Sequence, residues 1–120
     1  MQIAICDDED FFRKELRSLL VEYKNNRRLS LDIFEFPNGQ FLLQSDVVFD
    51  IVFLDYQMPS LNGMEIARIL RQKNSLCSIV FVTNYSDFVF ESFEVNPYRF
   101  FKKPVRLDQI EELLQSYIKQ

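Results

Sequence analysis

The sequence contains no histidine and no tryptophan, and only two of its 120 residues are cysteines. Cys6 lies inside one apolar run and Cys77 near the start of another, without the CxxC spacing of zinc-binding motifs. A zinc site and a Cys-His nucleophile pair are therefore both excluded. We expect the two cysteines to act as small buried hydrophobic residues.

Glycine and proline are also scarce, with two and four residues respectively. Disordered and loop-dominated chains contain more of both, whereas a hydrophobic fraction of 48% with thirteen phenylalanines favours a well-filled core. A chain of this length suits one domain. We therefore expect residues 1–120 to form a single unit, without a linker or a low-complexity segment.

Long apolar runs and basic stripes are missing as well. No run approaches the roughly 18 residues of a membrane-spanning helix, and residues 1–2 lead directly into an apolar strand rather than a signal peptide. We therefore expect a cytoplasmic protein that has no membrane partner. The net charge of -4 is made of scattered acids and bases, so we do not expect this segment to bind DNA.

Apolar runs and helical periodicities alternate along the chain. The expected strands are residues 2–6, 31–36, 51–55, 78–83 and 98–102. The expected helices are residues 10–26, 40–45, 64–73, 86–95 and 107–118. Strict alternation predicts an α/β fold, a doubly wound (βα)5 parallel sheet of five strands in the order 2-1-3-4-5 with helices on both faces.

Particular residues are expected to begin and orient these helices. Asp10 can cap the first helix with its side chain. Phe41 and Leu42 are expected to point inward from the second helix. The apolar spacing of the third helix places Ile69 on the buried face, beside Ile66 and its neighbours.

Polar side chains follow three of the expected strands at the points where the strands end. The apolar run 51–54 stops at Asp55, the first strand leads into Asp7 and Asp8, and the fourth strand ends at Thr83. Since the carboxyl ends of parallel strands meet at one edge of a sheet, these side chains should lie close together. Three carboxylates there cannot all ionise without a cation, and an open site of oxygen ligands suits Mg²⁺.

The end of the central strand is also a suitable place for a nucleophile. Asp55 is the carboxylate best placed to attack a phosphoryl group and form an acyl phosphate. Thr83 can donate its hydroxyl to one phosphoryl oxygen, and Lys103, just after the fifth strand, its ammonium to another. The sequence therefore predicts a phosphoryl acceptor site.

Along its whole length the chain resembles the receiver domains of bacterial two-component response regulators, which have the flavodoxin-like fold of CheY. The resemblance rests on the order and spacing of five features, namely Asp7-Asp8, the segment FLDYQMPSLNG around Asp55, Thr83, Phe100 and Lys103-Pro104. One departure is Asn84, which follows Thr83 where receivers usually have a very small residue. We expect Asn84 either to narrow the access to Asp55 or to add a hydrogen bond there.

The resemblance implies a role for each of these positions. Asp55 would be the phosphorylation site, Asp8 a direct Mg²⁺ ligand and Asp7 a ligand acting through water. The backbone carbonyl of Gln57 would be a further ligand. Thr83 and Phe100 would form the switch that responds to phosphorylation. The resemblance also implies that the Lys103-Pro104 bond is cis, and that any self-phosphorylation or self-dephosphorylation is slow.

Finer features, including Gln57-Met58-Pro59 and residues 93–101, resemble receivers that precede a LytTR-type DNA-binding domain. This implies a sensor histidine kinase as phosphoryl donor, with transcription controlled through an output domain that this chain does not contain. A stand-alone receiver acting by protein contact is the alternative. The apolar residues of 88–93 spread over more than one face of their helix. We therefore expect the face formed by residues 86–95, 98–102 and 107–118 to mediate homodimerisation or contact with an effector domain on phosphorylation.

Plainer interpretations of the same residues stay open. The acids at residues 7–10 could favour a helix start electrostatically, Asp55 could turn the chain, and Lys103 could be a solvated lysine. Phe100 could be ordinary core. Mg²⁺-dependent phosphatases with an Asp nucleophile have an Asp-x-Asp motif after an apolar strand. Here Gln57 occupies the position of the second Asp, which makes this alternative weak. A degenerate receiver that only binds partners is disfavoured because all five features are present.

Overall fold

The computed structural model describes residues 1–59, 61–74, 76–84 and 93–119. The strands are β1 (Gln2–Cys6), β2 (Asp32–Phe36), β3 (Ile51–Asp55), β4 (Ser78–Thr83) and β5 (Arg99–Lys102). The helices are α1 (Asp10–Arg27), α2 (Gly39–Gln44), α3 (Gly63–Lys73) and α5 (Leu107–Ile118), with a 3-10 turn at Phe93–Val95. Most of the helix expected at residues 86–95 lies outside the described residues.

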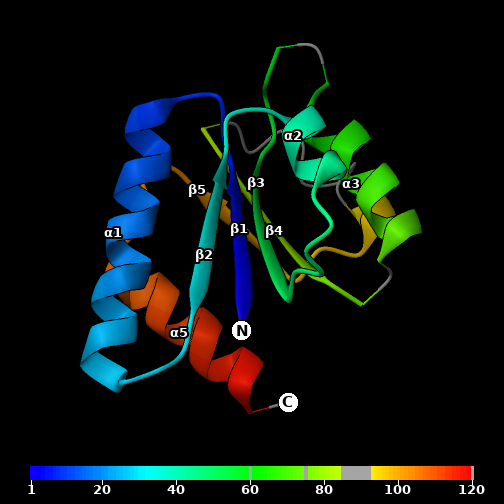
Figure 1. Ribbon diagram of the computed structural model, residues 1–120. Helices are drawn as coiled ribbons and strands as arrows, with labels where there is room; N and C mark the ends of the chain where they lie inside the picture. The colour runs from blue at the N-terminus through cyan, green and yellow to red at the C-terminus, as the bar shows by residue number, and fades with distance from the viewer. Residues whose placement is uncertain (60, 75, 85–92, 120) are drawn as a thin grey trace.

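The sheet has the predicted topology. Its five strands are all parallel and follow the order β2-β1-β3-β4-β5. Figure 1 shows α1 and α5 on one face of the sheet and α2 and α3 on the other. The N-terminus and the start of β1 lie at the lower edge in this view, so the carboxyl ends of the parallel strands form the upper edge. None of the described helices is long and apolar enough to cross a membrane.

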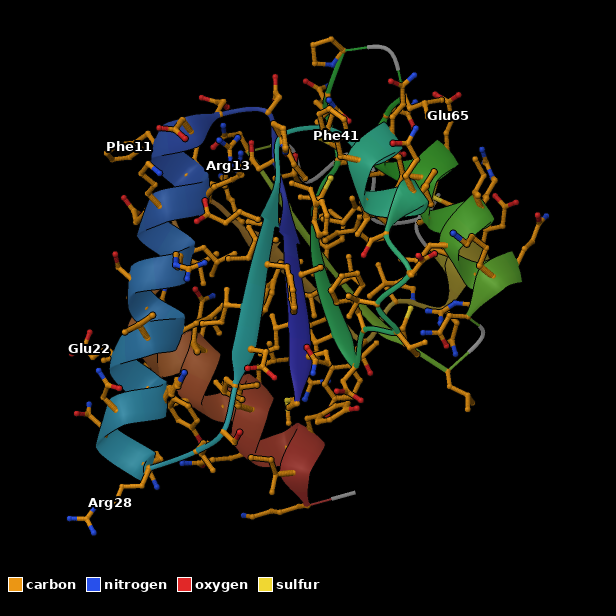
Figure 2. All side chains as sticks on the ribbon, viewed as in Figure 1. Phe11, Arg13, Glu22, Arg28, Phe41 and Glu65 are labelled. Atoms are coloured by element: carbon orange, nitrogen blue, oxygen red, sulfur yellow. The ribbon has the colours of Figure 1, made fainter. Side chains whose placement is uncertain are left out.

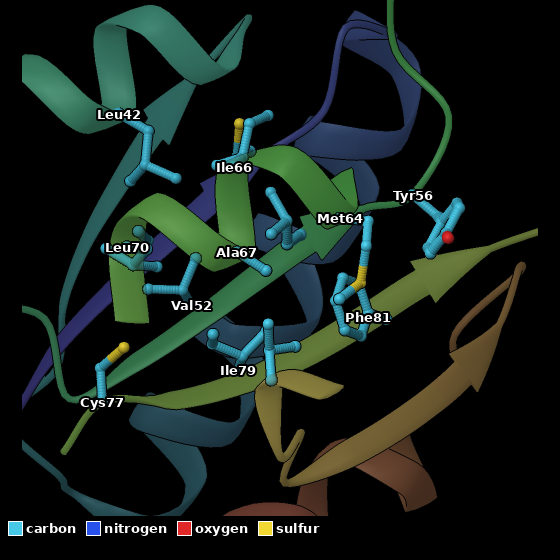
Figure 3. Packing of buried hydrophobic residues seen from close by; sticks show 14 of the residues in the cluster. Leu42, Val52, Tyr56, Met64, Ile66, Ala67, Leu70, Cys77, Ile79 and Phe81 are labelled. Carbon is cyan, nitrogen blue, oxygen red and sulfur yellow. The ribbon is translucent and has the colours of Figure 1, made fainter. Parts of the chain in front are cut away.

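The core has two halves, one on each face of the sheet. Successive side chains of a strand point to opposite faces, so Phe53 of β3 packs with α1 and α5, and Val52 packs with α2 and α3. Figure 3 shows the second half, where Ile66 and Leu70 of α3 lie over the sheet. Burying a side chain of this size contributes about 1.5–3 kcal/mol, so these contacts hold the helices against the sheet.

The helix starts differ in how they are capped. Asn62 and Glu65 form a capping box at α3, in which each side chain accepts a hydrogen bond from the backbone N–H of the other at 2.9 and 3.2 Å. The prediction that Asp10 caps α1 is wrong, because Asp10 is already helical and Glu9 occupies the N-cap. Asp10 instead accepts a hydrogen bond from Arg13, one turn further along the helix.

Two predictions about buried helix residues are also wrong. Phe41 is 53% exposed, because α2 has only six residues and buries Leu42 rather than Phe41. Ile69 is 39% exposed, because the buried face of α3 passes through residues 66, 67 and 70 and Ile69 lies beside it. The two cysteines are free and buried, as predicted.

Candidate functional site

Three carboxylates gather at the carboxyl edge of the sheet. Asp7 and Asp8 follow β1, and Asp55 ends β3, which pairs with β1. Each residue offers an oxygen, and these oxygens lie within 4.8 Å of one another. Asp7 and Asp55 are buried and Asp8 is exposed, so solvent reaches the cluster at Asp8.

The buried ammonium group of Lys103 faces this cluster. Its Nζ lies 2.8 Å from Oδ2 of Asp7 and 3.5 Å from Oδ1 of Asp55. The same atom is 3.7 Å from Glu9 and 4.1 Å from the ring centre of Phe12, which gives a cation–π contact. Burial acts to lower the pKa of Lys103, but the hydrogen bond to Asp7 and the charges of Asp55 and Asp7 raise it overall. Lys103 is therefore a fixed positive charge.

One lysine does not neutralise three carboxylates. Burial, and after it the charge of Asp7, raises the pKa of Asp55 to about 7, although Lys103 acts in the opposite direction. Without a further cation, the negative charge on Asp55 is therefore disfavoured. A divalent cation would restore its negative charge.

Backbone contacts fix the position of Asp7. Its N–H donates to the carbonyl of Phe36 at the end of β2, at 3.1 Å. Its Oδ1 accepts a hydrogen bond from the N–H of Glu9 at 2.9 Å, and its Oδ2 faces Lys103. Both carboxylate oxygens are therefore in use. This favours the prediction that Asp7 binds a metal ion through water, which stays a prediction.

The loop after β3 depends on a close approach to the start of α3. The N–H of Gly63 donates to the carbonyl of Tyr56 at 2.7 Å. A Cβ on Gly63 would lie 2.7 Å from Cα of Tyr56 and would collide with the carbonyl oxygen of Asp55. Only glycine fits there, and Gln57 lies exposed in the same loop. The role of the Gln57 carbonyl stays a prediction.

Thr83 and Phe100 lie on the neighbouring strands β4 and β5. Thr83 is 1% exposed at the end of β4, and its carbonyl accepts a hydrogen bond from the N–H of Lys103 at 2.8 Å. The Lys103-Pro104 peptide bond is cis, as the resemblance implied. The half-buried Phe100 ring lies 6.0 Å from the ring of Phe81, which lies 5.7 Å from that of Tyr56. A row of aromatic rings therefore joins the end of β3 to β5.

The structure brings together the site residues predicted from sequence and adds others. Asp7, Asp8, Asp55 and Lys103 form one cluster, with Thr83 on the adjoining strand. Sequence reasoning missed the contacts that Glu9 and Phe12 make with Lys103, and also the space requirement at Gly63. For Gly63 a signal existed, since Asn62-Gly63 is a turn pair directly before an amphipathic helix. For Phe12, the sequence showed only an apolar residue at helical spacing, which does not indicate a contact with Lys103.

Comparison with known proteins gives a consistent result. A family model described as the response regulator receiver domain matches residues 3–115. The chain is 36% identical to the sensory transduction protein LytT of Bacillus cereus, covering 100% of this chain and 48% of that protein. It is 30% identical to the positive alginate biosynthesis regulatory protein of Pseudomonas aeruginosa, covering 97% of this chain and 46% of that protein. The chain spans about half the length of these relatives.

Solved structures extend the similarity to three dimensions. The response regulatory domain of protein mrkE from Klebsiella pneumoniae superposes with a TM-score of 0.82 and 27% identity, over 100% of both chains. The response regulator TrrA from Thermotoga maritima, solved in complex with Mg²⁺-BeF, superposes with a TM-score of 0.83 and 25% identity, over 97% of both chains. The likeness therefore includes the whole sheet.

Proposed function

The chain belongs to the response regulator receiver domain family, and on that premise we propose that it is a phosphorylation switch that accepts a phosphoryl group on Asp55 with Mg²⁺. One observation carries this proposal most directly. Oxygens of Asp7, Asp8 and Asp55 lie within 4.8 Å of one another, with the Lys103 ammonium 3.5 Å from Asp55. This arrangement supplies a nucleophile, a cation site and a fixed positive charge at one edge of the sheet.

The donor atoms fit Mg²⁺. All are oxygens, and Mg²⁺ binds through one or two carboxylates while it keeps several waters. We assign the exposed Asp8 as a direct ligand, together with Asp55 and the carbonyl of Gln57, and Asp7 as a ligand through water. When bound, Mg²⁺ would neutralise negative charge on the transferring phosphoryl group.

The side chains of the site would then have distinct roles in the transfer. A carboxylate oxygen of Asp55 forms a bond to phosphorus while the bond between phosphorus and the imidazole nitrogen of a kinase phosphohistidine breaks. The imidazole leaves and takes a proton from water. Lys103, held in place by Asp7, donates to one phosphoryl oxygen, and the hydroxyl of Thr83 donates to another.

The signal would leave the domain through β5 and α5. The hydroxyls of Tyr98 and Ser116 lie 2.8 Å apart, and Arg99 pairs with Glu112 at 3.1 Å, so the strand and the helix are tied together. We propose that Phe100 turns inward when Thr83 moves toward the phosphoryl group. The face of β5 and α5 would then mediate homodimerisation, together with the helix expected from sequence at residues 86–95, most of which lies outside the described residues.

The lengths of the relatives suggest a larger protein. We propose that residues 1–120 are the receiver domain of a regulator that receives its phosphoryl group from a sensor histidine kinase. A LytTR-type output domain would bind DNA and control transcription. The similarity to LytT and to the alginate regulator, each about twice as long as this chain, supports this assignment.

Phosphorylation is tested by intact-mass measurement after treatment with acetyl phosphate and Mg²⁺. The wild type should gain one phosphoryl group, and Asp55→Asn should gain none. Asp46→Asn, which alters an exposed acid on the opposite edge, should behave as the wild type. A phosphoryl group on Asp55→Asn, or none on the wild type, would show that the proposal is wrong.

Metal binding has its own test. Mg²⁺ should raise the melting temperature, because a ligand of the native state stabilises it, by about 1.4 kcal/mol at ten times its Kd. Asp8→Asn should lose most of this shift, and Asp46→Asn should keep it. An unchanged shift in Asp8→Asn would contradict its assignment as the direct ligand.

The dimer face is tested by sedimentation with and without beryllofluoride and Mg²⁺. The wild type should associate only in their presence. Lys102→Glu reverses an exposed charge on β5 and should weaken the association, whereas Arg28→Glu makes the same charge change at the far end of α1 (Figure 2). Equal effects of the two variants would count against this face.

A further inference from the structure

Arg13 lies on the side of α1 that faces the sheet, whereas Phe11 on the same helix points outward (Figure 2). Its side chain is only 12% exposed. The guanidinium donates to the backbone carbonyl of Asp7 at 2.7 Å and to Oδ1 of Asp10 at 2.6 Å. It also lies 3.5 Å from Oε1 of Glu35. One side chain thus joins the loop after β1, the first turn of α1 and the end of β2.

The contact with the Asp7 carbonyl bears directly on the acidic cluster. That carbonyl belongs to the peptide unit between Asp7 and Asp8. A peptide unit is planar, so a hydrogen bond to its oxygen restrains the plane that also contains the backbone nitrogen and Cα of Asp8. The carboxylate of Asp7 is held separately, by the N–H of Glu9 and by Lys103. The peptide unit that Arg13 holds is therefore the one that leads into the exposed Asp8.

Glu35 in turn holds Arg13. It lies one residue before the end of β2, where the carbonyl of Phe36 accepts the N–H of Asp7. Its Oε1 faces Arg13, and its Oε2 lies 3.4 Å from Arg17, one helical turn further along α1. Arg17 donates to the carbonyl of Ile33. The two arginines therefore share one acid and contact different backbone carbonyls.

We propose that Arg13 is a positioning residue for the divalent cation site, which it serves by orienting the Asp7–Asp8 peptide unit, and that Glu35 holds Arg13 in place. This inference rests on the proposed Mg²⁺ site. A purely electrostatic role predicts the opposite sign, because a positive charge near three carboxylates weakens the binding of a cation. If only charge mattered, removing Arg13 would tighten Mg²⁺ binding. If orientation matters, removing it weakens binding.

The test is calorimetric titration of the full chain with Mg²⁺ after removal of metals by a chelator. Arg13→Ala should raise the Kd about tenfold, as expected when an outer partner of a metal ligand is lost. Arg17→Ala is the matched control. It removes an arginine that contacts Glu35 but does not contact the Asp7 carbonyl, so the Kd for Mg²⁺ should be unchanged. Arg13→Lys keeps the charge without the planar fork and should recover part of the loss.

A Kd for Arg13→Ala equal to or lower than that of the wild type would overturn the proposal, provided that its circular dichroism spectrum is native. If Arg13→Ala does not fold, Glu35→Gln tests the same connection and should raise the Kd by a smaller factor. An unchanged Kd in Glu35→Gln would then overturn it. Absence of Mg²⁺ binding in the wild type would overturn this inference together with the metal site. Normal binding in both wild type and Arg13→Ala would overturn the inference alone.

Discussion

Strand β3 combines two kinds of burial that have opposite energetic signs. Residues 51–54 are apolar and at most 1% exposed, and their burial contributes favourably to the free energy of folding. Asp55 is 5% exposed, but its burial removes hydration from a carboxylate and is unfavourable. The apolar residues of β3 therefore stabilise the fold, while the buried carboxylate at its end is electrostatically unfavourable. Binding of a cation would reduce this unfavourable contribution, and the carboxylate remains available to accept a phosphoryl group.

The largest expected effect on stability comes from the core side of this comparison. Phe53→Ala should lower the free energy of unfolding by about 3–5 kcal/mol, because it leaves a cavity between the sheet and its α1 and α5 face. Urea unfolding followed by circular dichroism measures the loss. The exposed Phe41 provides the control, and Phe41→Ala should change stability by less than about 0.5 kcal/mol. Similar losses of unfolding free energy in Phe53→Ala and Phe41→Ala would contradict the conclusion that the buried side chains of β3 stabilise the fold.

Gly63→Ala probes the junction between core and site. Its Cβ would collide with the backbone of Asp55 and Tyr56, so we expect a loss of about 1–3 kcal/mol and slower phosphorylation of Asp55. Gly39→Ala is the matched control, because there the new Cβ meets the side chain of the buried Ile66 rather than the backbone. Stability and intact mass against time measure both effects. A larger loss in Gly39→Ala would show that the backbone contact at Gly63 does not dominate.

The smallest effect is a pH dependence from the site itself. The folded pKa of Asp55 is raised to about 7, above its unfolded value of about 4. Between these values the folded state binds more protons than the unfolded state, so metal-free stability should fall as the pH rises from about 4 to about 7. We expect on the order of 1 kcal/mol, because solvent that reaches Asp8 screens the cluster.

Asp55→Asn separates this contribution from all other titrating groups. In the presence of a chelator, the difference in unfolding free energy between wild type and Asp55→Asn should change over this pH range. Saturating Mg²⁺ should reduce that change, because the cation stabilises the ionised carboxylate. A difference that is constant from pH 4 to 7 would contradict the raised pKa of Asp55.

The sequence predicts the strands better than it predicts which helix side chains are buried. The strands β1, β3 and β4 have the predicted bounds, because continuous apolar runs have a single favourable place inside a sheet covered on both faces. Phe41 and Ile69 were wrongly predicted to be buried. The apolar face of α2 is short and that of α3 is broad, and neither pattern specifies which apolar side chain packs against another element. That choice depends on how α2 and α3 pack together.

The sequence by itself determined that Asp7, Asp8, Asp55 and Thr83 lie at one edge of the sheet, since the carboxyl ends of parallel strands must meet there. Only the tertiary structure decided how the charges pair. Lys103 contacts Asp7 more closely than Asp55, at 2.8 against 3.5 Å, and Arg13 reaches the Asp7 carbonyl with Glu35 beside it. These contacts join segments far apart in the chain, and their distances depend on how α1, β2 and the end of β5 pack, which no local pattern encodes.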